Sequence, residues 1–334
     1  MAKKIKDTEY LAISTRIRAM ENGLLTREKM EQVLDARSDD EAIKILQDCG
    51  YPELDPTHPE SMDAALAAAR EATLADLADS APDPRYIDIF KLKYDYHNVK
   101  AVLKAEAMGT NPDHMLMDMG RVSAAELKEA VMSGELEDLP PRLAAAAAEA
   151  KEVLDTTRDP QLSDIVLDRW CYLDMDDVAE ATGSDFLHGY VRAQIDAANL
   201  RSLIRTIRMG KNTEFLRGVL FQGGDIEVDA VLKVSENGGN GLMDLYAPTR
   251  FRAAAEAGTE ALQGGALTAF EKLCDDAVSD YLAGAQFVPF GEAPLLAYLA
   301  ARETEYTNLR ILLLGRSTGL NADIIRSRLR ASYV

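Results

Sequence analysis

Three segments of the sequence repeat an acidic residue, an asparagine three positions later, and a glycine eleven positions after the asparagine. The copies are Asp95, Asn98 and Gly109; Asp196, Asn199 and Gly210; and Glu305, Asn308 and Gly319. A carboxylate and a carboxamide at this spacing lie on one helix face, where they can bond each other or a neighbouring segment. The same groups could serve a ligand or a metal ion, but two groups per helix are too few to enclose a metal. We therefore favour a polar clamp that fixes how each repeated helix packs.

Other positions of the three copies also match. A basic residue follows each asparagine by two positions, at Lys100, Arg201 and Arg310, and apolar residues follow by four and five. The 334 residues include 56 Asp and Glu, 37 Lys and Arg and 21 Gly, so chance would place an acid, a base and a glycine at these offsets from about one asparagine in a thousand. The three copies are therefore an internal repeat.

A second element follows the first two copies and reads as a turn before a short helix. It is Gly-Arg-Val-Ser from Gly120 and Gly-Asp-Ile-Glu from Gly224. No such element follows the third copy, but Gly-Leu-Leu-Thr from Gly23 has the same pattern. We therefore expect the N-terminal segment to complete the third copy. The predicted modules are 36–133, 134–235, and 236–334 packed with 1–35.

The rest of the chain predicts an all-α fold. Hydrophobic residues make up 47% of the sequence, and they recur at helical spacing over long stretches without proline such as 62–78, 143–154 and 262–282. Ser123 and Thr26 stand where helix N-caps are expected, each with acidic residues in the turn that follows. We expect three pseudo-threefold helical modules in a closed or nearly closed arrangement.

The charge of the chain is unevenly distributed. The net charge of −19 argues against sequence-independent binding of nucleic acid. The windows 85–104, 186–217 and 298–334 nevertheless sum to +10, so the remainder carries −29. The basic residues of the repeated helices are Lys100, Lys104, Arg201, Arg205, Arg208, Arg310 and Arg316. They could simply complement helix dipoles, or they could grip one acidic partner inserted along the module axis.

The sequence lacks the usual catalytic patterns. Its four histidines have no paired-ligand spacing, and neither GxSxG nor GxxxxGK[ST] occurs. Three widely separated cysteines, Cys49, Cys171 and Cys274, indicate neither a disulfide framework nor a thiolate metal site, which fits a reducing cytoplasm. No export signal is visible, and the apolar runs are too short to span a bilayer. We expect no catalytic, cofactor or metal residues, and only a peripheral membrane role.

The C-terminal region resembles a known family. The run from Phe290 to Arg310, then Gly315, Gly319-Leu320 and Arg328 to Tyr333, resembles the C subunit of the V-type and A-type ATPases, called the d subunit in eukaryotes. Further similar segments are Tyr10-Leu-Ala, Arg16-Ile-Arg-Ala-Met, Leu24-Leu25 and Asp164 to Tyr172. The resemblance therefore covers nearly the whole chain.

The resemblance implies an all-helical funnel of three similar modules on the cytoplasmic face of the membrane proteolipid ring. A protein of this family joins the ring to a central shaft of subunits D and F, and it transmits torque without an active site or cofactor. The resemblance leaves open whether the complex transports H+ or Na+. The third acid, Glu305, departs from the aspartates of the first two copies, so the three copies are not fully equivalent.

Two other function classes remain open on the sequence alone. An α-helical repeat scaffold could bind a soluble acidic partner, using the same basic residues. A helical hydrolase or lyase with an uncommon site would need a deep pocket that holds acids of perturbed pKa. Association with a membrane complex separates the rotor protein from both alternatives.

Overall fold

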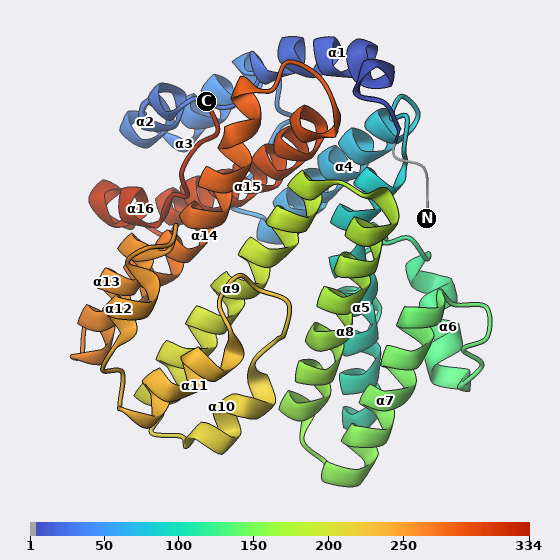
Figure 1. Cartoon of the computed structure of the whole chain (residues 1–334). Coiled ribbons are helices and arrows are strands. Elements are labelled where there is room, and N and C mark those ends of the chain that lie inside the picture. Colours follow the sequence, from blue (N-terminus) through green and yellow to red (C-terminus); the bar gives the residue numbers. More distant parts are fainter. Residues whose placement is uncertain (1–4) are drawn as a thin grey trace. The chain divides into compact units, whose positions relative to one another are not determined.

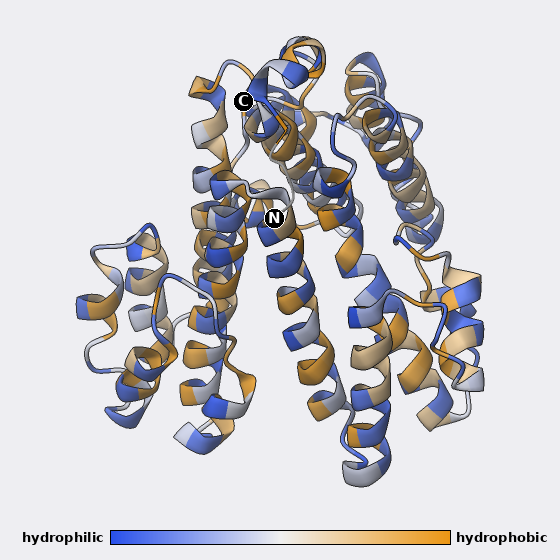
Figure 2. Cartoon of the chain, turned by 45° about the vertical axis from the view of Figure 1, so that its right-hand side comes forward, coloured by the Kyte–Doolittle hydropathy of each residue, from blue (hydrophilic) through white to orange (hydrophobic). Residues whose placement is uncertain are grey.

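The computed structural model describes residues 5–334, and this part of the chain consists of helices joined by loops, with no strand (Figure 1). The prediction of an all-α fold is confirmed. Hydrophilic and hydrophobic residues alternate along most helices, as expected for helices with one buried face (Figure 2). No helix of the described chain is both long enough and apolar enough to cross a membrane.

The elements include three short 3₁₀ helices, labelled η. Those of residues 5–82 are η1 (Asp7–Tyr10), α1 (Leu11–Glu21), α2 (Arg27–Asp35), α3 (Asp39–Asp48) and α4 (Pro59–Ala78). Those of residues 83–208 are α5 (Arg85–Met108), η2 (Asp113–Met115), α6 (Ala124–Ser133), α7 (Pro141–Thr157), α8 (Pro160–Thr182) and α9 (Asp185–Arg208). The remaining elements are α10 (Thr213–Val219), α11 (Val228–Glu236), α12 (Leu242–Tyr246), α13 (Arg252–Leu262), α14 (Leu267–Ala283), η3 (Gly284–Phe287), α15 (Glu292–Ser317) and α16 (Ala322–Arg328).

The chain divides into two compact units. Unit 1 is the segment Asp83–Val191, and unit 2 combines Ile5–Pro82 with Arg192–Val334. The boundary at Val191 lies inside α9, so this helix contributes residues to both units.

In unit 1, α5 is the helix on which the others pack. It contacts α6, α7 and α8, and α7 and α8 pair along their lengths. Their apolar faces form one core, which includes Val99 and Leu103 of α5, Leu127 of α6, Leu143 of α7 and Leu167 of α8. Burial of these side chains is what holds the unit together.

In unit 2, α15 is the helix on which the others pack. It contacts α1, α4 and α14 along its sides, and it also contacts α2, α3 and α16 (Figure 1). One core joins Met30, Leu46 and Met62 of the N-terminal helices to Leu309 and Leu312 of α15. The N-terminal and C-terminal segments therefore pack together, as the sequence predicts.

The helix ends follow the capping signals in the sequence. Ser123 accepts a hydrogen bond from the N–H of Glu126, and Thr26 accepts one from the N–H of Lys29. The repeat glycines Gly109, Gly210 and Gly319 have φ of 66°, 64° and 70°. Each lies in the left-handed region just after a motif helix, where the chain must turn and glycine carries no steric penalty.

The three modules predicted from the sequence, with boundaries after 133 and after 235, stay a prediction. The hydrophobic cores indicate which helices belong to the same module. Helices α7 and α8 share a core with α5, and α3 and α4 share one with α15. A boundary after 133 would separate α7 and α8 from the helix on which they pack.

Candidate functional site

The three repeated asparagines make the same contact. Each carboxamide donates to the carbonyl and accepts from the N–H of one residue in a passing segment, at distances of 2.8–3.1 Å. The pairs are Asn98 with Met117, Asn199 with Phe221, and Asn308 with Arg330. A buried asparagine that satisfies both backbone groups of one residue fixes that segment against the helix. The polar clamp expected from the sequence is therefore present in all three copies.

The repeated acids bind the segment that follows the clamp. Each of the first two aspartates accepts hydrogen bonds from two successive backbone N–H groups, at 2.9–3.3 Å. Asp95 binds Arg121 and Val122, and Asp196 binds Asp225 and Ile226. These donors belong to the second element that the sequence shows after each copy.

The glycine that opens the second element is required by this contact. A methyl group on Gly120 would lie 2.1 Å from Oδ1 of Asp95, and one on Gly224 would lie 2.1 Å from Oδ1 of Asp196. Such a distance is far inside van der Waals contact. Only a residue without a side chain lets the carboxylate reach the two N–H groups.

In the third copy the acid reaches across to the other end of the chain. Glu305 accepts a hydrogen bond from the N–H of Leu25, and Ser332 donates from its hydroxyl to the carbonyl of Leu25 at 3.2 Å. Leu25 thus takes the place that Val122 has in the first copy. The sequence signal for this contact is the Gly-Leu-Leu-Thr pattern. The glutamate side chain is longer than aspartate, and it reaches a segment from the other end of the chain, whereas Asp95 and Asp196 bind the segment that follows their own clamp.

The three acids differ in their charged neighbours. Arg121 binds Asp95 at 2.8 Å and Asp174 at 2.7 Å, so the first copy has a partly buried guanidinium between two buried carboxylates. Arg302 binds Glu305 in the third copy and also donates to the hydroxyl of Tyr306 at 2.9 Å. The repeat pattern marks neither arginine as a partner of its acid. Arg302 could have been found, because it precedes the acid by three positions on the same helix face.

The second copy has no arginine in these positions. Asp225 stands where the first copy has Arg121, and the contacts of Asp196 are backbone N–H groups. Burial raises the pKa of Asp196 to about 6, the two N–H donors oppose this shift, and the charge of Asp225 adds to it. The hydroxyl of Tyr246, also buried nearby, has no hydrogen-bond partner in the described chain. Of the three repeat acids, Asp196 is therefore the one without an arginine ion pair in the described chain, although the charge of Arg250 lowers its pKa.

The seven basic residues proposed from the sequence all bind groups of their own chain. Six form ion pairs: Lys100 with Asp168, Lys104 with Asp164, Arg201 with Asp275, Arg205 with Glu271, Arg310 with Asp63, and Arg316 with Asp39. Arg208 donates to the carbonyl of Gly265 at 2.9 Å. The contact of these seven residues with an acidic partner stays a prediction.

These ion pairs follow the repeat. The base two positions after the asparagine pairs with an aspartate on a neighbouring long helix in each copy: Asp168 on α8, Asp275 on α14 and Asp63 on α4. Because the partner acids lie 68, 74 and 247 residues away in the sequence, composition alone could not reveal the pairing. The basic windows therefore reflect, at least in part, how each motif helix is attached to its neighbour.

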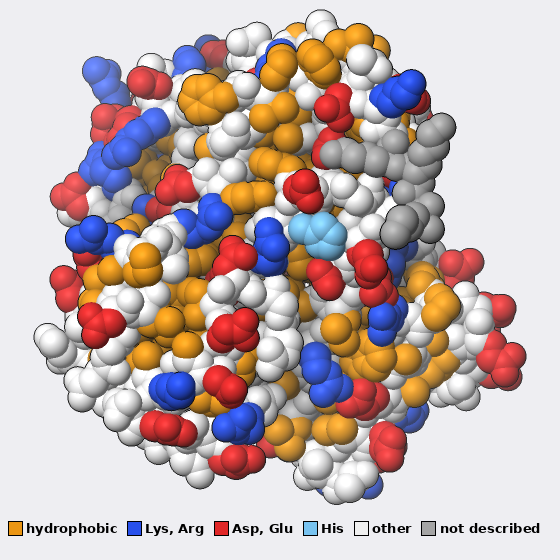
Figure 3. All heavy atoms as spheres, viewed as in Figure 1, with side chains coloured by type: hydrophobic (Ala, Val, Ile, Leu, Met, Phe, Trp, Pro, Cys, Tyr) orange, Lys and Arg blue, Asp and Glu red, His pale blue; other side chains and the backbone are white. Residues whose placement is uncertain are grey.

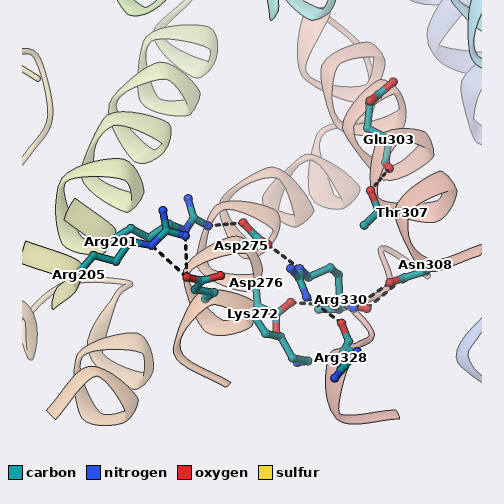
Figure 4. Close-up of polar contacts among 12 residues, drawn as sticks. Arg201, Arg205, Lys272, Asp275, Asp276, Glu303, Thr307, Asn308, Arg328 and Arg330 are labelled. Carbon is teal, nitrogen blue, oxygen red and sulfur yellow. Dashed lines mark hydrogen bonds and ion pairs between the residues drawn. The ribbon is translucent and has the colours of Figure 1, made fainter. Parts of the chain in front are cut away.

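Asp275 and its neighbour join two copies within unit 2 (Figure 4). One oxygen of Asp275 binds Arg201 of α9, and the other binds Arg330 of the C-terminal segment at 2.5 Å. Asp276 accepts the N–H of Ala331 at 2.8 Å and also pairs with Lys272. The C-terminal segment is thus held by α14 on one side and by Asn308 of α15 on the other.

The described residues contain no group of three or more His, Cys, Asp or Glu side chains arranged to hold a metal ion. The features that the structure brings together are structural contacts between helices, segments and chain ends.

Comparison with known proteins relates this chain to one family. The family model described as ATP synthase (C/AC39) subunit matches residues 13–328. The C subunit of the V-type sodium ATPase of Enterococcus hirae is 28% identical over 326 residues, which cover 97% of this chain and 99% of that protein. The C subunit of the A-type ATP synthase of Methanocaldococcus jannaschii is 25% identical, with 96% of this chain and 86% of that protein covered. The equivalent protein of Thermococcus kodakarensis is 23% identical, with coverage of 96% and 90%.

Proposed function

Because the chain belongs to the ATP synthase (C/AC39) subunit family, we propose that it is a non-catalytic rotor adaptor of a V/A-type rotary ATPase. In this role it links a central shaft of subunits D and F to the membrane proteolipid ring, on the cytoplasmic face. The observation that carries the proposal is the family match, which runs through both units from residue 13 to residue 328.

The contacts within the chain support a role in transmitting force. A torque adaptor must not yield when its two partners pull in opposite directions. Here each motif helix is attached by a buried asparagine clamp, by an acid that binds a passing segment, and by an ion pair to a neighbouring long helix. Buried polar contacts of this kind are costly to break, because each leaves unsatisfied groups behind.

We propose that the seven basic residues contact the shaft. If the chain is instead a scaffold, they would contact an acidic soluble partner. Each already binds a carboxylate or a carbonyl, so a partner would have to share or displace that group. Replacing Arg201, Arg205 and Arg208 by Ala should then weaken binding of the shaft and flatten its salt dependence. The same substitutions also remove contacts to α14 and Gly265, so the free energy of unfolding must be measured alongside.

The proposed role is tested by purifying the tagged full chain from gently solubilised membranes and identifying the co-purified proteins by mass spectrometry. We expect proteolipid, shaft and catalytic subunits together. In membranes that lack this chain, we expect ATP hydrolysis by the catalytic head to continue without ion transport. Re-expression of the chain should restore the coupling.

The control is a parallel purification through a tagged catalytic subunit from the same membranes. If that preparation contains an intact, coupled ATPase without this chain, the rotor role is wrong. Recovery of the tagged chain with soluble proteins alone would then favour the scaffold.

A further inference from the structure

A shallow groove of about 520 Å³ lies along α6 in unit 1. Its apolar lining is Leu116, Ala124, Ala125 and Met132, and Met132 is 51% exposed. Figure 3 shows hydrophobic side chains gathered on this side of the molecule, next to acidic side chains at its edge. An exposed methionine in an open groove is a typical adaptable contact for another protein.

The polar lining of the groove is acidic. It contains Asp113, Asp118 and Glu129 against one base, Lys128. Asp113 already pairs with Lys128 at 2.6 Å, and Asp118 accepts the N–H of Ala124 at 2.8 Å. Glu129 is exposed and has no ion pair within the described chain. The charge that remains available to a partner is therefore negative.

The sequence around the groove also has a negative net charge. Residues 111–138 contain seven Asp and Glu and two Lys and Arg. One of those two bases, Arg121, is engaged between Asp95 and Asp174. The stretch with the same place after the asparagine of the second copy, 212–239, has five acids and two bases, so the acidic excess is larger beside α6.

We propose that this groove is a docking site for a basic amphipathic helix of a partner protein. The apolar side of such a helix would lie on Leu116, Ala125 and Met132, and its Lys or Arg side chains would reach Glu129 and Asp118. Recognition of this kind combines apolar burial with complementary charge at the rim. The groove and its charge are independent of the rotor role, and they require a basic partner, whereas the basic residues of the repeat helices would require an acidic one.

The test uses the full chain and two synthetic peptides of about 14 residues, roughly 21 Å long as helices. Both carry the same stripe of Leu on one face. One has Lys on both sides of the stripe, and the other has Glu at the same positions. Binding is measured by fluorescence anisotropy at low and at physiological salt.

We expect the lysine peptide to bind at least about tenfold more tightly than the glutamate peptide, with an affinity that falls as salt rises. Glu129→Lys and Met132→Ser should each weaken it about five- to tenfold, since both side chains are exposed and neither change should affect folding. Glu152→Lys on α7 makes the same charge change at another exposed position of unit 1 and should leave the affinity within about twofold. Failure of the lysine peptide to bind, equal binding of both peptides, or equal loss in the Glu152 control would overturn the proposal.

Discussion

In the first two copies, a side chain on the glycine of the second element would overlap the repeat carboxylate. Gly120→Ala and Gly224→Ala should each lower the free energy of unfolding by about 2–4 kcal/mol, because the new methyl group would displace the buried carboxylate from the two N–H groups that it binds. Urea unfolding followed by circular dichroism measures the change.

Gly218 of α10 provides the matched control, because a methyl group there would meet no atom within 4 Å. Gly218→Ala should leave stability unchanged or raise it by up to about 1 kcal/mol, through the better helix propensity of alanine. A Gly120→Ala protein as stable as the Gly218→Ala protein would show that the carboxylate has room to move.

Asp196 predicts a specific pH dependence of stability. Its pKa in the folded chain, about 6, lies above the value near 3.9 expected when unfolded, so the folded state binds more protons between these values. The stability that this group contributes is therefore full below about pH 4 and is lost as the pH rises through 6. In the unmodified chain this group should lower the free energy of unfolding by about 1–3 kcal/mol between pH 4 and pH 7, and Asp196→Asn should abolish that decrease.

The pH dependence is measured as the free energy of unfolding at several pH values for each variant. Asp229→Asn, at a mostly exposed position of α11, should leave the slope as in the unmodified chain. If Asp196→Asn keeps that slope too, another group is responsible for it.

At the scale of elements, each asparagine holds one passing segment, so its loss should act locally. Asn308→Ala leaves the N–H and carbonyl of Arg330 without their partner, and we expect faster hydrogen exchange at Arg330 and Ala331. Amides in the middle of α15 should keep their protection, because the core around Leu309 is untouched.

Asn199→Ala offers the matched comparison, since its contact with Phe221 is fully buried. It should cost more stability than Asn308→Ala, by about 1 kcal/mol. Unchanged exchange at Arg330 in the Asn308 variant would mean that Asp275 and Asp276 hold the C-terminal segment alone.

The sequence predicted these elements well where the signal was local or repeated. Helix periodicity and the caps at Ser123 and Thr26 depend on neighbouring residues, and each is confirmed. The pairing of Leu25 with Glu305 was accessible because the repeat showed which element was missing.

What the sequence could not predict are contacts between helices far apart in the chain. Nothing near Arg201 indicates Asp275, and nothing near Arg121 indicates Asp174, because such pairs are set by packing. The cores also suggest a different repeat unit, which begins at each motif helix and includes the two long helices packed on it. For the first copy that unit would run from α5 through α8.

At the scale of the whole molecule, the two units have separate cores, and the chain contains a single tryptophan, Trp170, on α8 of unit 1. Tryptophan fluorescence therefore reports the unfolding of unit 1, whereas circular dichroism reports both units. Leu167 belongs to the core of unit 1 and Leu309 to that of unit 2, and both are fully buried. Substitution of either by Ala should cost about 2–5 kcal/mol in its own unit.

We expect Leu167→Ala to shift the fluorescence transition to lower urea, and Leu309→Ala to shift the circular dichroism transition while the fluorescence midpoint stays in place. The two variants are controls for each other, because they delete the same atoms from equally buried positions. Equal shifts of both probes in both variants would mean that α9, which contributes residues to the two units, makes them unfold as one. Such cooperativity would indicate that the chain behaves as one rigid element that couples its partners. Separate transitions would indicate that the chain yields most easily at the boundary inside α9.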